Sequence, residues 1–176
     1  MMAKKNIDKK GKSVNIIGKG KTWGEAPKDG YSIGLTQLIL RRPVDLVIDM
    51  NMYADGRWGQ AELDENKKVM ELCKKNKIPY IGLDNYPLKE VMKKFKTDYF
   101  GSTVDYAIAY VLNEGFTDIH LYGVTISMGD YARLKAGCDF WCGYAKGLGA
   151  EVTVHGESSV MKTLDRKIYG YDIEQK

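Results

Sequence analysis

The stretch "STVDYAIAYVLNEGFTDIHLYGV", residues 102–124, contains a helix signal followed directly by a strand signal. Ser102 is a natural N-cap and Gly115 a natural C-cap, so the residues between them are expected to form a helix. The run "DIHLYGV", residues 118–124, is short and apolar, which is typical of a strand buried on both faces. A capped helix that leads into such a strand is the repeating unit of α/β proteins.

The same kind of short apolar run occurs five more times, at 13–18, 31–37, 44–50, 78–83 and 151–156. Helical patterns lie between several of these runs, and a strand and helix alternation predicts an α/β fold. We therefore expect a single Rossmann-like domain with a mainly parallel sheet of about six strands and helices on both faces.

Details of this prediction concern the ends of the chain and the order of the strands. We expect residues 1–12 to form a flexible basic tail and residues 13–176 to form one nucleotide-binding domain. Residues 13–18, 44–50 and 118–124 are expected to be neighbours at the centre of the sheet. In the helical pattern "AELDENKKVMELCKKNK", Leu63, Met70 and Cys73 share one face and are expected to face the core.

Composition narrows the class of protein. The chain has 176 residues, 44% hydrophobic and 28% charged, which is the balance of a soluble globular protein. No run is long enough for a membrane helix, and the three cysteines form no Cys-x-x-Cys pair, so we expect a cytoplasmic protein without a membrane partner, a disulfide or a metal site. The net charge of +4 comes from dispersed lysines, which makes a nucleic-acid partner unlikely and favours a small anionic ligand. The sequence leaves open whether the chain forms a homo-oligomer.

The loop after the first strand, "GKGKT", is the first candidate for ligand binding. Glycines at such a position let backbone N–H groups approach a phosphate, and lysines with a threonine hydroxyl supply charge and donors. The pattern matches neither the dinucleotide motif nor the phosphate-binding loop, so a tight turn with solvated lysines is the alternative. The candidate binding residues here are Gly18, Lys19, Gly20, Lys21 and Thr22.

Other candidates lie at further strand ends, where ligands bind in parallel sheets. Asn51 follows the third strand and has the amide needed to hydrogen-bond a base or sugar, or else it simply forms a turn. Ser102 and Thr103 begin a helix, where hydroxyls and free N–H groups hold anions. Helix capping alone is the favoured alternative, and the two roles are compatible. His155, at the end of the last strand, is the better of the two histidines as a general acid or base, and His120 lies inside a strand.

Several segments resemble a known group of proteins. These segments are "SVNIIGKGKTW", "YSIGLTQ", "VDLVIDMN", "GSTVDYAIAYVLNEGFTDIHLYGV" and "FWCGYAKGLGAEVTVHGESSVMKT". They look like small, often phage-encoded Rossmann-like proteins related to the 6-hydroxymethylpterin pyrophosphokinase-like family and, more distantly, to bacterial sialyltransferases that use a CMP-activated sugar. By this resemblance the cytidine nucleotide would be held by residues 18–22, Thr36, Asn51, and Ser102 with Thr103.

The sequence also departs from these relatives. Their loop reads Gly-Asn-Gly-Pro-Ser where this chain has Gly-Lys-Gly-Lys-Thr, and their fifth strand ends in an aspartate where this chain has Thr125. The stretch that corresponds to their catalytic lid histidine, residues 126–141, contains no histidine, which leaves Tyr131 near the lid as an alternative proton carrier. Sialyl transfer is therefore not expected.

Two functions follow from this resemblance. The first is a protein that binds a nucleotide or a nucleotide-derived anion and, as a phage protein in the host cytoplasm, sequesters a cyclic-nucleotide or other nucleotide defence signal. The second is a nucleotide-dependent glycosyl- or pyrophosphoryl-transferase, for which Mg²⁺ is a conceivable cofactor. A partner-binding module with a vestigial pocket is a third hypothesis, which requires Trp58 and Trp141 to be exposed.

Overall fold

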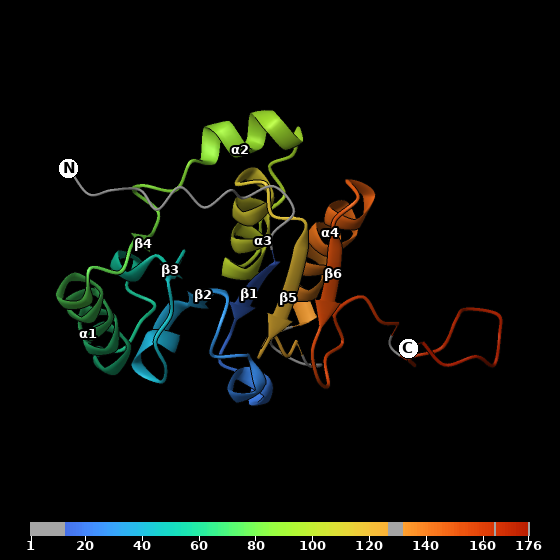
Figure 1. Cartoon of the computed structure of the whole chain (residues 1–176), viewed down its shortest axis with the longest axis horizontal. Helices are drawn as coiled ribbons and strands as arrows, with labels where there is room; N and C mark the ends of the chain where they lie inside the picture. The colour runs from blue at the N-terminus through green and yellow to red at the C-terminus, as the bar shows by residue number, and fades with distance from the viewer. Residues whose placement is uncertain (1–12, 127–131, 164, 176) are drawn as a thin grey trace.

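The computed structural model describes residues 13–126, 132–163 and 165–175, and within them a single six-stranded sheet forms the centre of the fold (Figure 1). The strand order is β4-β3-β2-β1-β5-β6, and each pair of neighbours is parallel. The strands are β1 (Ser13–Ile17), β2 (Tyr31–Leu35), β3 (Leu46–Ile48), β4 (Tyr80–Ile81), β5 (Asp118–Tyr122) and β6 (Glu151–Val154).

Helices connect the strands and cover the sheet. The α-helices are α1 (Gln60–Asn76), α2 (Leu88–Phe95), α3 (Thr103–Asn113) and α4 (Ala132–Gly147), and the 3₁₀ helices are η1 (Lys21–Glu25), η2 (Thr36–Leu40) and η3 (Tyr53–Asp55). Figure 1 shows α1 at the β4 end of the sheet and α4 at the β6 end. The segment 165–175, which contains one antiparallel bridge between Lys167 and Glu174, stands away from the body in the same view.

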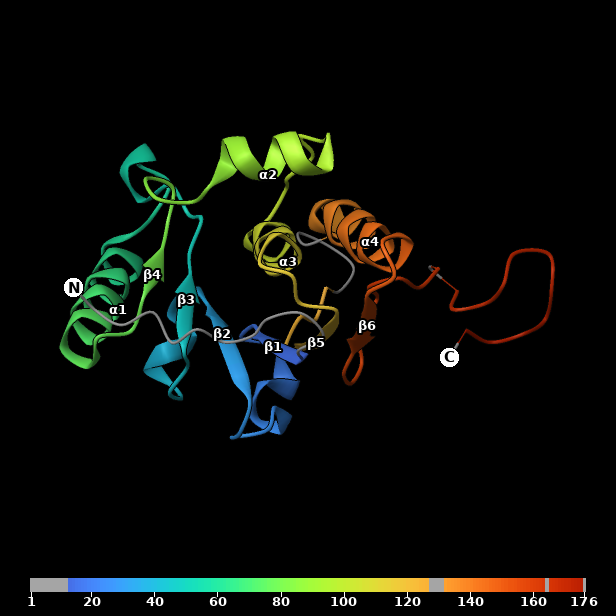
Figure 2. The same ribbon diagram turned by 45° about the horizontal axis from the view of Figure 1, so that its top comes forward.

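The two faces of the sheet have separate cores because strand side chains alternate in direction. On one face, buried residues such as Val14 and Ile16 pack against α2, α3 and α4, which Figure 2 shows on the same side of the sheet. On the other face, Ile17 and Val47 pack against η1, η2 and α1. The parallel sheet with helices on both faces confirms the predicted α/β class.

The helix over 102–115 is confirmed together with the residues that cap its two ends. The Ser102 hydroxyl accepts a hydrogen bond from the Asp105 amide at 3.4 Å, and the Asp105 carboxylate accepts one from the Ser102 amide at 3.0 Å, which makes a capping box. Gly115 follows the helix with φ +85°, a conformation that favours glycine. Trp141 of α4 packs fully buried against this layer, so it supports no partner surface.

Two expectations about local arrangement are wrong. β2 lies between β1 and β3, because the connections between these consecutive strands are short and carry only 3₁₀ turns, so each strand pairs with the next. In α1 the buried positions are Val69 and Cys73, and Met70 is 48% exposed, one position further round the helix.

Two expectations about the chain's organisation are not tested by these findings. The expected basic tail, residues 1–12, lies outside the described residues, and the single domain from 13 to 176 stays a prediction. In the described part of the chain, no helix is long and apolar enough to cross a membrane.

Candidate functional site

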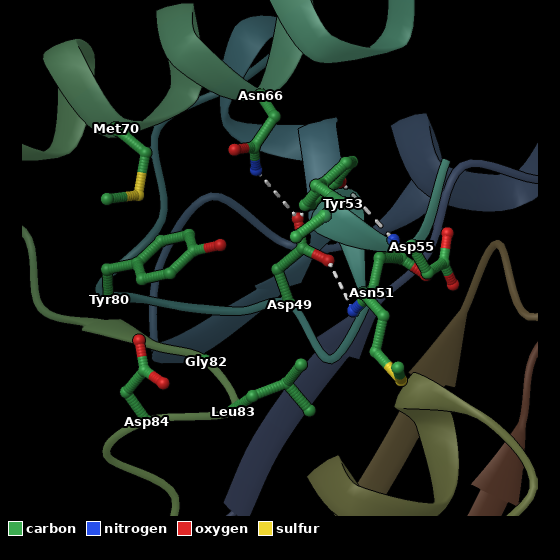
Figure 3. A pocket seen from close by; sticks show the side chains of 12 residues that line it. Asp49, Asn51, Tyr53, Asp55, Asn66, Met70, Tyr80, Gly82, Leu83 and Asp84 are labelled. Atoms are coloured by element: carbon green, nitrogen blue, oxygen red, sulfur yellow. Dashed lines mark hydrogen bonds between the residues drawn. The ribbon is translucent and has the colours of Figure 1, made fainter. Parts of the chain in front are cut away.

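A cavity of about 500 Å³ opens at the carboxyl ends of β3 and β4 (Figure 3). Its floor is Asp49, the first residue after β3, whose exposed fraction is 1%. The wall opposite comes from α1, which contributes Asn66 and Met70. The full lining is Asp49, Asn51, Met52, Tyr53, Ala54, Asp55, Asn66, Met70, Tyr80, Gly82, Leu83 and Asp84. Carboxylates, amides and phenols with a few apolar side chains form a site that suits an uncharged, hydrogen-bonding ligand group.

The Asp49 carboxylate is held by three donors. It accepts hydrogen bonds from the Tyr53 hydroxyl at 2.8 Å, the Asn66 amide at 3.3 Å and the Asn51 backbone N–H at 3.2 Å. Burial raises the pKa of Asp49, and these hydrogen bonds oppose the rise because they stabilise the charged form. The carboxylate is therefore fixed in position and retains acceptor capacity beyond its three protein donors.

The Tyr53 hydroxyl is the junction of the polar network. It donates to Asp49 and accepts from the Asn51 side-chain amide at 3.3 Å and from the Gln37 amide at 3.2 Å. Burial raises the pKa of Tyr53, so the phenol stays protonated and continues to donate. Its ring packs against Trp58 at a centroid distance of 5.2 Å. This arrangement leaves the side-chain oxygen of Asn51, Oδ1, without a hydrogen-bond partner among the described residues.

Gln37 extends the network to the loop after β1. Its side-chain oxygen, Oε1, accepts a hydrogen bond from the Lys19 ammonium at 2.7 Å. A continuous chain of hydrogen bonds, Lys19–Gln37–Tyr53–Asp49, therefore connects the ends of β1, β2 and β3. Thr36, directly before Gln37, has φ 52°. A β-branched residue in this region is strained, and such strain is concentrated at functional positions. Lys19, Thr36 and Asn51, predicted separately, thus lie on or next to one network.

The glycines of the loop at 18–22 have a packing role. The amide of Gly18 donates to the Tyr122 carbonyl and that of Gly20 to the Gly123 carbonyl, both at 2.8 Å. A Cβ on Gly18 would lie 2.5 Å from the Gly123 oxygen, and one on Gly20 would lie 2.8 Å from it. These two N–H groups are therefore used within the protein, and a ligand role of the loop stays a prediction that rests on its lysines.

Thr22 and Lys21 differ in what their side chains do. The buried Thr22 hydroxyl accepts from the Gly123 amide at 2.8 Å and donates to the His155 carbonyl at 3.3 Å. Lys21 is exposed and has no hydrogen bond or ion pair with any described residue. Arg41, at the end of η2, donates to the Lys19 carbonyl at 3.4 Å. Lys19, Lys21 and Arg41 thus form a basic cluster without a carboxylate partner in the described part of the chain.

Ser102 and Thr103 are placed at the start of α3 as predicted, but the Ser102 hydroxyl is committed to its own helix. It donates to the Asp105 carboxylate at 2.7 Å and caps the helix. Gly137 of α4 leaves the space that buried Asp105 occupies, since a Cβ there would lie 2.2 Å from the carboxylate. No hydrogen bond between described residues joins Ser102 to Asn51 or to the loop at 18–22. A ligand role for Ser102 and Thr103 stays a prediction.

The two histidines lie on the face of the sheet away from α3 and α4. His155 follows β6, and its ring stacks on Tyr122 of β5. Neither histidine lines the cavity. Among the described residues no cluster of three or more histidine, cysteine, aspartate or glutamate side chains is arranged to hold a metal ion. Tyr131, the alternative proton carrier, lies outside the described residues.

Sequence reasoning did not single out Gln37, Asn66 or Tyr80, although all three belong to the site. Gln37 has a signal in the sequence, since it is the polar residue that ends the run at 31–37. Asn66 lies inside a strongly charged helix pattern and Tyr80 inside an apolar run, so neither pattern indicates that the side chain faces a cavity.

No protein-family model matches the chain, and no curated protein matches it in sequence. Among solved structures it is similar to the sialyltransferase CstII from Campylobacter jejuni in complex with the substrate analogue CMP-3FNeuAc, at 16% identity and a TM-score of 0.42, over 81% of this chain and 79% of that chain. It is similar also to the same enzyme in complex with cytidine-5'-monophosphate, at 15% identity and a TM-score of 0.42, over 82% of this chain and 80% of that chain. The pyrophosphokinase-like resemblance stays a prediction. We therefore take the function from the chain's own residues.

Proposed function

We propose that this protein binds a nucleotide or a nucleotide-derived anion, with the nucleoside in the cavity and the phosphate facing Lys19 and Lys21. The observation that carries the proposal is the hydrogen-bonded chain from Lys19 through Gln37 and Tyr53 to Asp49, because it joins a basic cluster to a polar cavity that contains no lysine or arginine. A nucleotide has the same division into an uncharged ring system and an anionic end.

The cavity offers complementary groups for a nucleoside. The side-chain oxygen of Asn51 accepts a hydrogen bond from a base amino group or a ribose hydroxyl, and the Asp49 carboxylate has a remaining acceptor position. Tyr80 contributes an aromatic wall, and burial raises the pKa of its phenol to about 12, so that it stays neutral. Asp55 and Asp84 at the rim repel phosphate, which orients the anionic end toward Lys19.

Calorimetry tests this proposal with a panel of nucleoside mono-, di- and triphosphates, CMP- and UDP-sugars and cyclic dinucleotides. Lys21→Ala should weaken the bound nucleotide about 10- to 100-fold, since hydrogen bonds to charged groups contribute about 1.5–3 kcal/mol. Lys74→Ala, which removes an exposed lysine from the far end of α1, is the matched control and should leave the affinity unchanged. Equal affinities of wild type and Lys21→Ala would show that the loop is a tight turn with no role in binding the nucleotide.

For the fate of the ligand we propose sequestration of a nucleotide signal without turnover, acting in the cytoplasm of a phage host. The titratable cavity side chains are carboxylates and phenols, and Asp49 and Tyr53 are tied to each other. Tight binding of the ground state alone lowers no reaction barrier. An unaltered nucleotide should therefore be recovered by chromatography after long incubation with Mg²⁺ and heat denaturation.

The alternative is a nucleotide-dependent glycosyl- or pyrophosphoryl-transferase. The observation that favours it is the contact between Thr22 and the His155 backbone, which brings a histidine to the loop that holds the lysines. Consumption of a nucleotide at more than one turnover per protein in the same incubation would establish the transferase and overturn sequestration.

A further inference from the structure

The chain contains two histidines, and the fold places them side by side. Nδ1 of His120 lies 3.0 Å from Nε2 of His155, and Nε2 of His120 lies 3.2 Å from a carboxylate oxygen of Asp118. The side chains of His120 and Asp118 are 26% and 36% exposed. Three titratable groups are thus joined in a line that runs along β5 toward its carboxyl end.

The register of the sheet produces this line. His120 lies opposite Thr153 in the parallel pair of β5 and β6, and the His155 amide donates to the Leu121 carbonyl at 2.9 Å, which extends the ladder beyond β6. His155 therefore lies beside Tyr122, and the two rings stack at a centroid distance of 4.0 Å with an angle of 6°. Stacking on a buried tyrosine fixes the plane of the His155 ring.

The hydrogen bonds determine the protonation of both rings. An ionised carboxylate only accepts, so His120 carries its proton on Nε2 and presents a lone pair at Nδ1. His155 must then donate from Nε2, which leaves its own Nδ1 as the proton acceptor at the end of the line.

We propose that Asp118, His120 and His155 form a proton relay in which His155 Nδ1 accepts a proton from a ligand hydroxyl bound beside the loop at 18–22. This inference rests on the transferase alternative and not on sequestration, so recovery of an unaltered nucleotide after incubation would overturn it. The position follows from Thr22, whose hydroxyl donates to the His155 carbonyl at 3.3 Å, and from Gly156, where a Cβ would lie 2.2 Å from the Thr22 methyl group. The loop at 18–22 is therefore in contact with the backbone segment that carries the His155 ring.

The relay supports proton transfer in a balanced way. As the hydroxyl oxygen bonds to the transferred glycosyl or phosphoryl group, its proton moves to His155 Nδ1, and the nucleotide leaves with the electron pair of the bond that breaks. The imidazolium that forms keeps its Nε2–H bond to His120, which is oriented by Asp118. Burial and the neighbouring His120 lower the pKa of His155, and Glu25 of η1 opposes this shift. His155 is therefore a neutral acceptor at neutral pH. Asp118 and His120 are positioning residues.

Nitrogen-15 NMR of the free protein tests the relay without any ligand, and only two imidazoles contribute to the spectrum. At neutral pH both rings should carry their proton on Nε2. Asp118→Ala should abolish this single tautomer in both rings, and Thr153→Ala, on the same sheet face, should retain it. A proton on Nδ1 of His155 in the wild type, or unchanged tautomers in Asp118→Ala, would overturn the relay.

Turnover of the nucleotide panel tests the role of His155. The variant His155→Gln keeps an N–H donor toward His120. It should lower turnover by about 10²- to 10⁴-fold, while the affinity for the nucleotide measured by calorimetry is unchanged. If the wild type binds a nucleotide but consumes none, the acid–base role is wrong although the binding function stands. If no nucleotide binds, the proposed function fails first.

Discussion

The contact between Gly18 and Gly123 gives the sharpest test of what the glycines after β1 do. In Gly18→Ala the new Cβ would lie 2.5 Å from the Gly123 carbonyl oxygen and 3.1 Å from its carbonyl carbon. Both atoms are backbone, so the contact is relieved only if the loops after β1 and β5 move apart. Such a movement strains the 2.8 Å bonds from Gly18 to Tyr122 and from Gly20 to Gly123.

The expected loss of unfolding free energy follows from these contacts. Overpacking costs about 1–3 kcal/mol, and each weakened backbone hydrogen bond about 0.5–1.5 kcal/mol. The lower entropy of the unfolded alanine chain returns about 0.4–1 kcal/mol. Gly18→Ala should therefore lose about 1–5 kcal/mol in urea unfolding, with an unchanged dependence on denaturant concentration.

Gly24→Ala is the matched control, because it lies in the same loop region and a Cβ there meets no atom within 4 Å. Its stability should equal or slightly exceed that of the wild type. A loss below about 1 kcal/mol in Gly18→Ala, combined with a large loss of nucleotide affinity, would refute the packing argument. In that case the glycine would serve the close approach of a phosphate.

Two further predictions concern carboxylates and caps. Burial raises the pKa of Asp49, so the native state binds its proton more tightly than the unfolded chain, and stability falls as pH rises from the ordinary aspartate pKa through the raised one. Urea unfolding across this range should show a smaller fall in Asp49→Asn, and an equal fall would contradict the raised pKa. Ser102→Ala should lose about 0.5–2 kcal/mol through the missing N-cap and leave nucleotide affinity unchanged, and a selective loss of affinity would instead establish Ser102 as a ligand residue.

The fold was largely predictable because its signals are local. The capping residues around 102–115 and the apolar runs of the strands depend on neighbours in sequence, and the structure has a helix or strand in each of these places. The order of the strands is not local, since it depends on which connections cross the sheet. The interposed β2 shows this limit.

The site was predictable only at strand ends. Lys19 and Asn51 follow apolar runs directly, and the structure connects both to one network. The connecting residues Gln37 and Tyr53 lie in short 3₁₀ turns, which have no periodic signal in the sequence. A line such as Asp118–His120–His155 depends on the register between two strands, and register is invisible in a single sequence.

The position of the cavity follows from how the sheet closes at its centre. In open α/β sheets the crevice where the strand order reverses, here between β1 and β5, is the usual ligand site. In this protein Gly18, Gly20 and Thr22 bond across that crevice to Tyr122 and Gly123, which fills it with backbone. The open space lies instead at β3 and β4, and the lysines lie at β1. Two strand spacings of about 4.8 Å each separate β1 from β3, so a group in the cavity and a group at Lys19 are about 10 Å apart. Inorganic phosphate is too small to contact both, whereas a nucleoside bearing phosphate is long enough, and this distance supports our proposal that the basic loop and the polar cavity are two ends of one binding site.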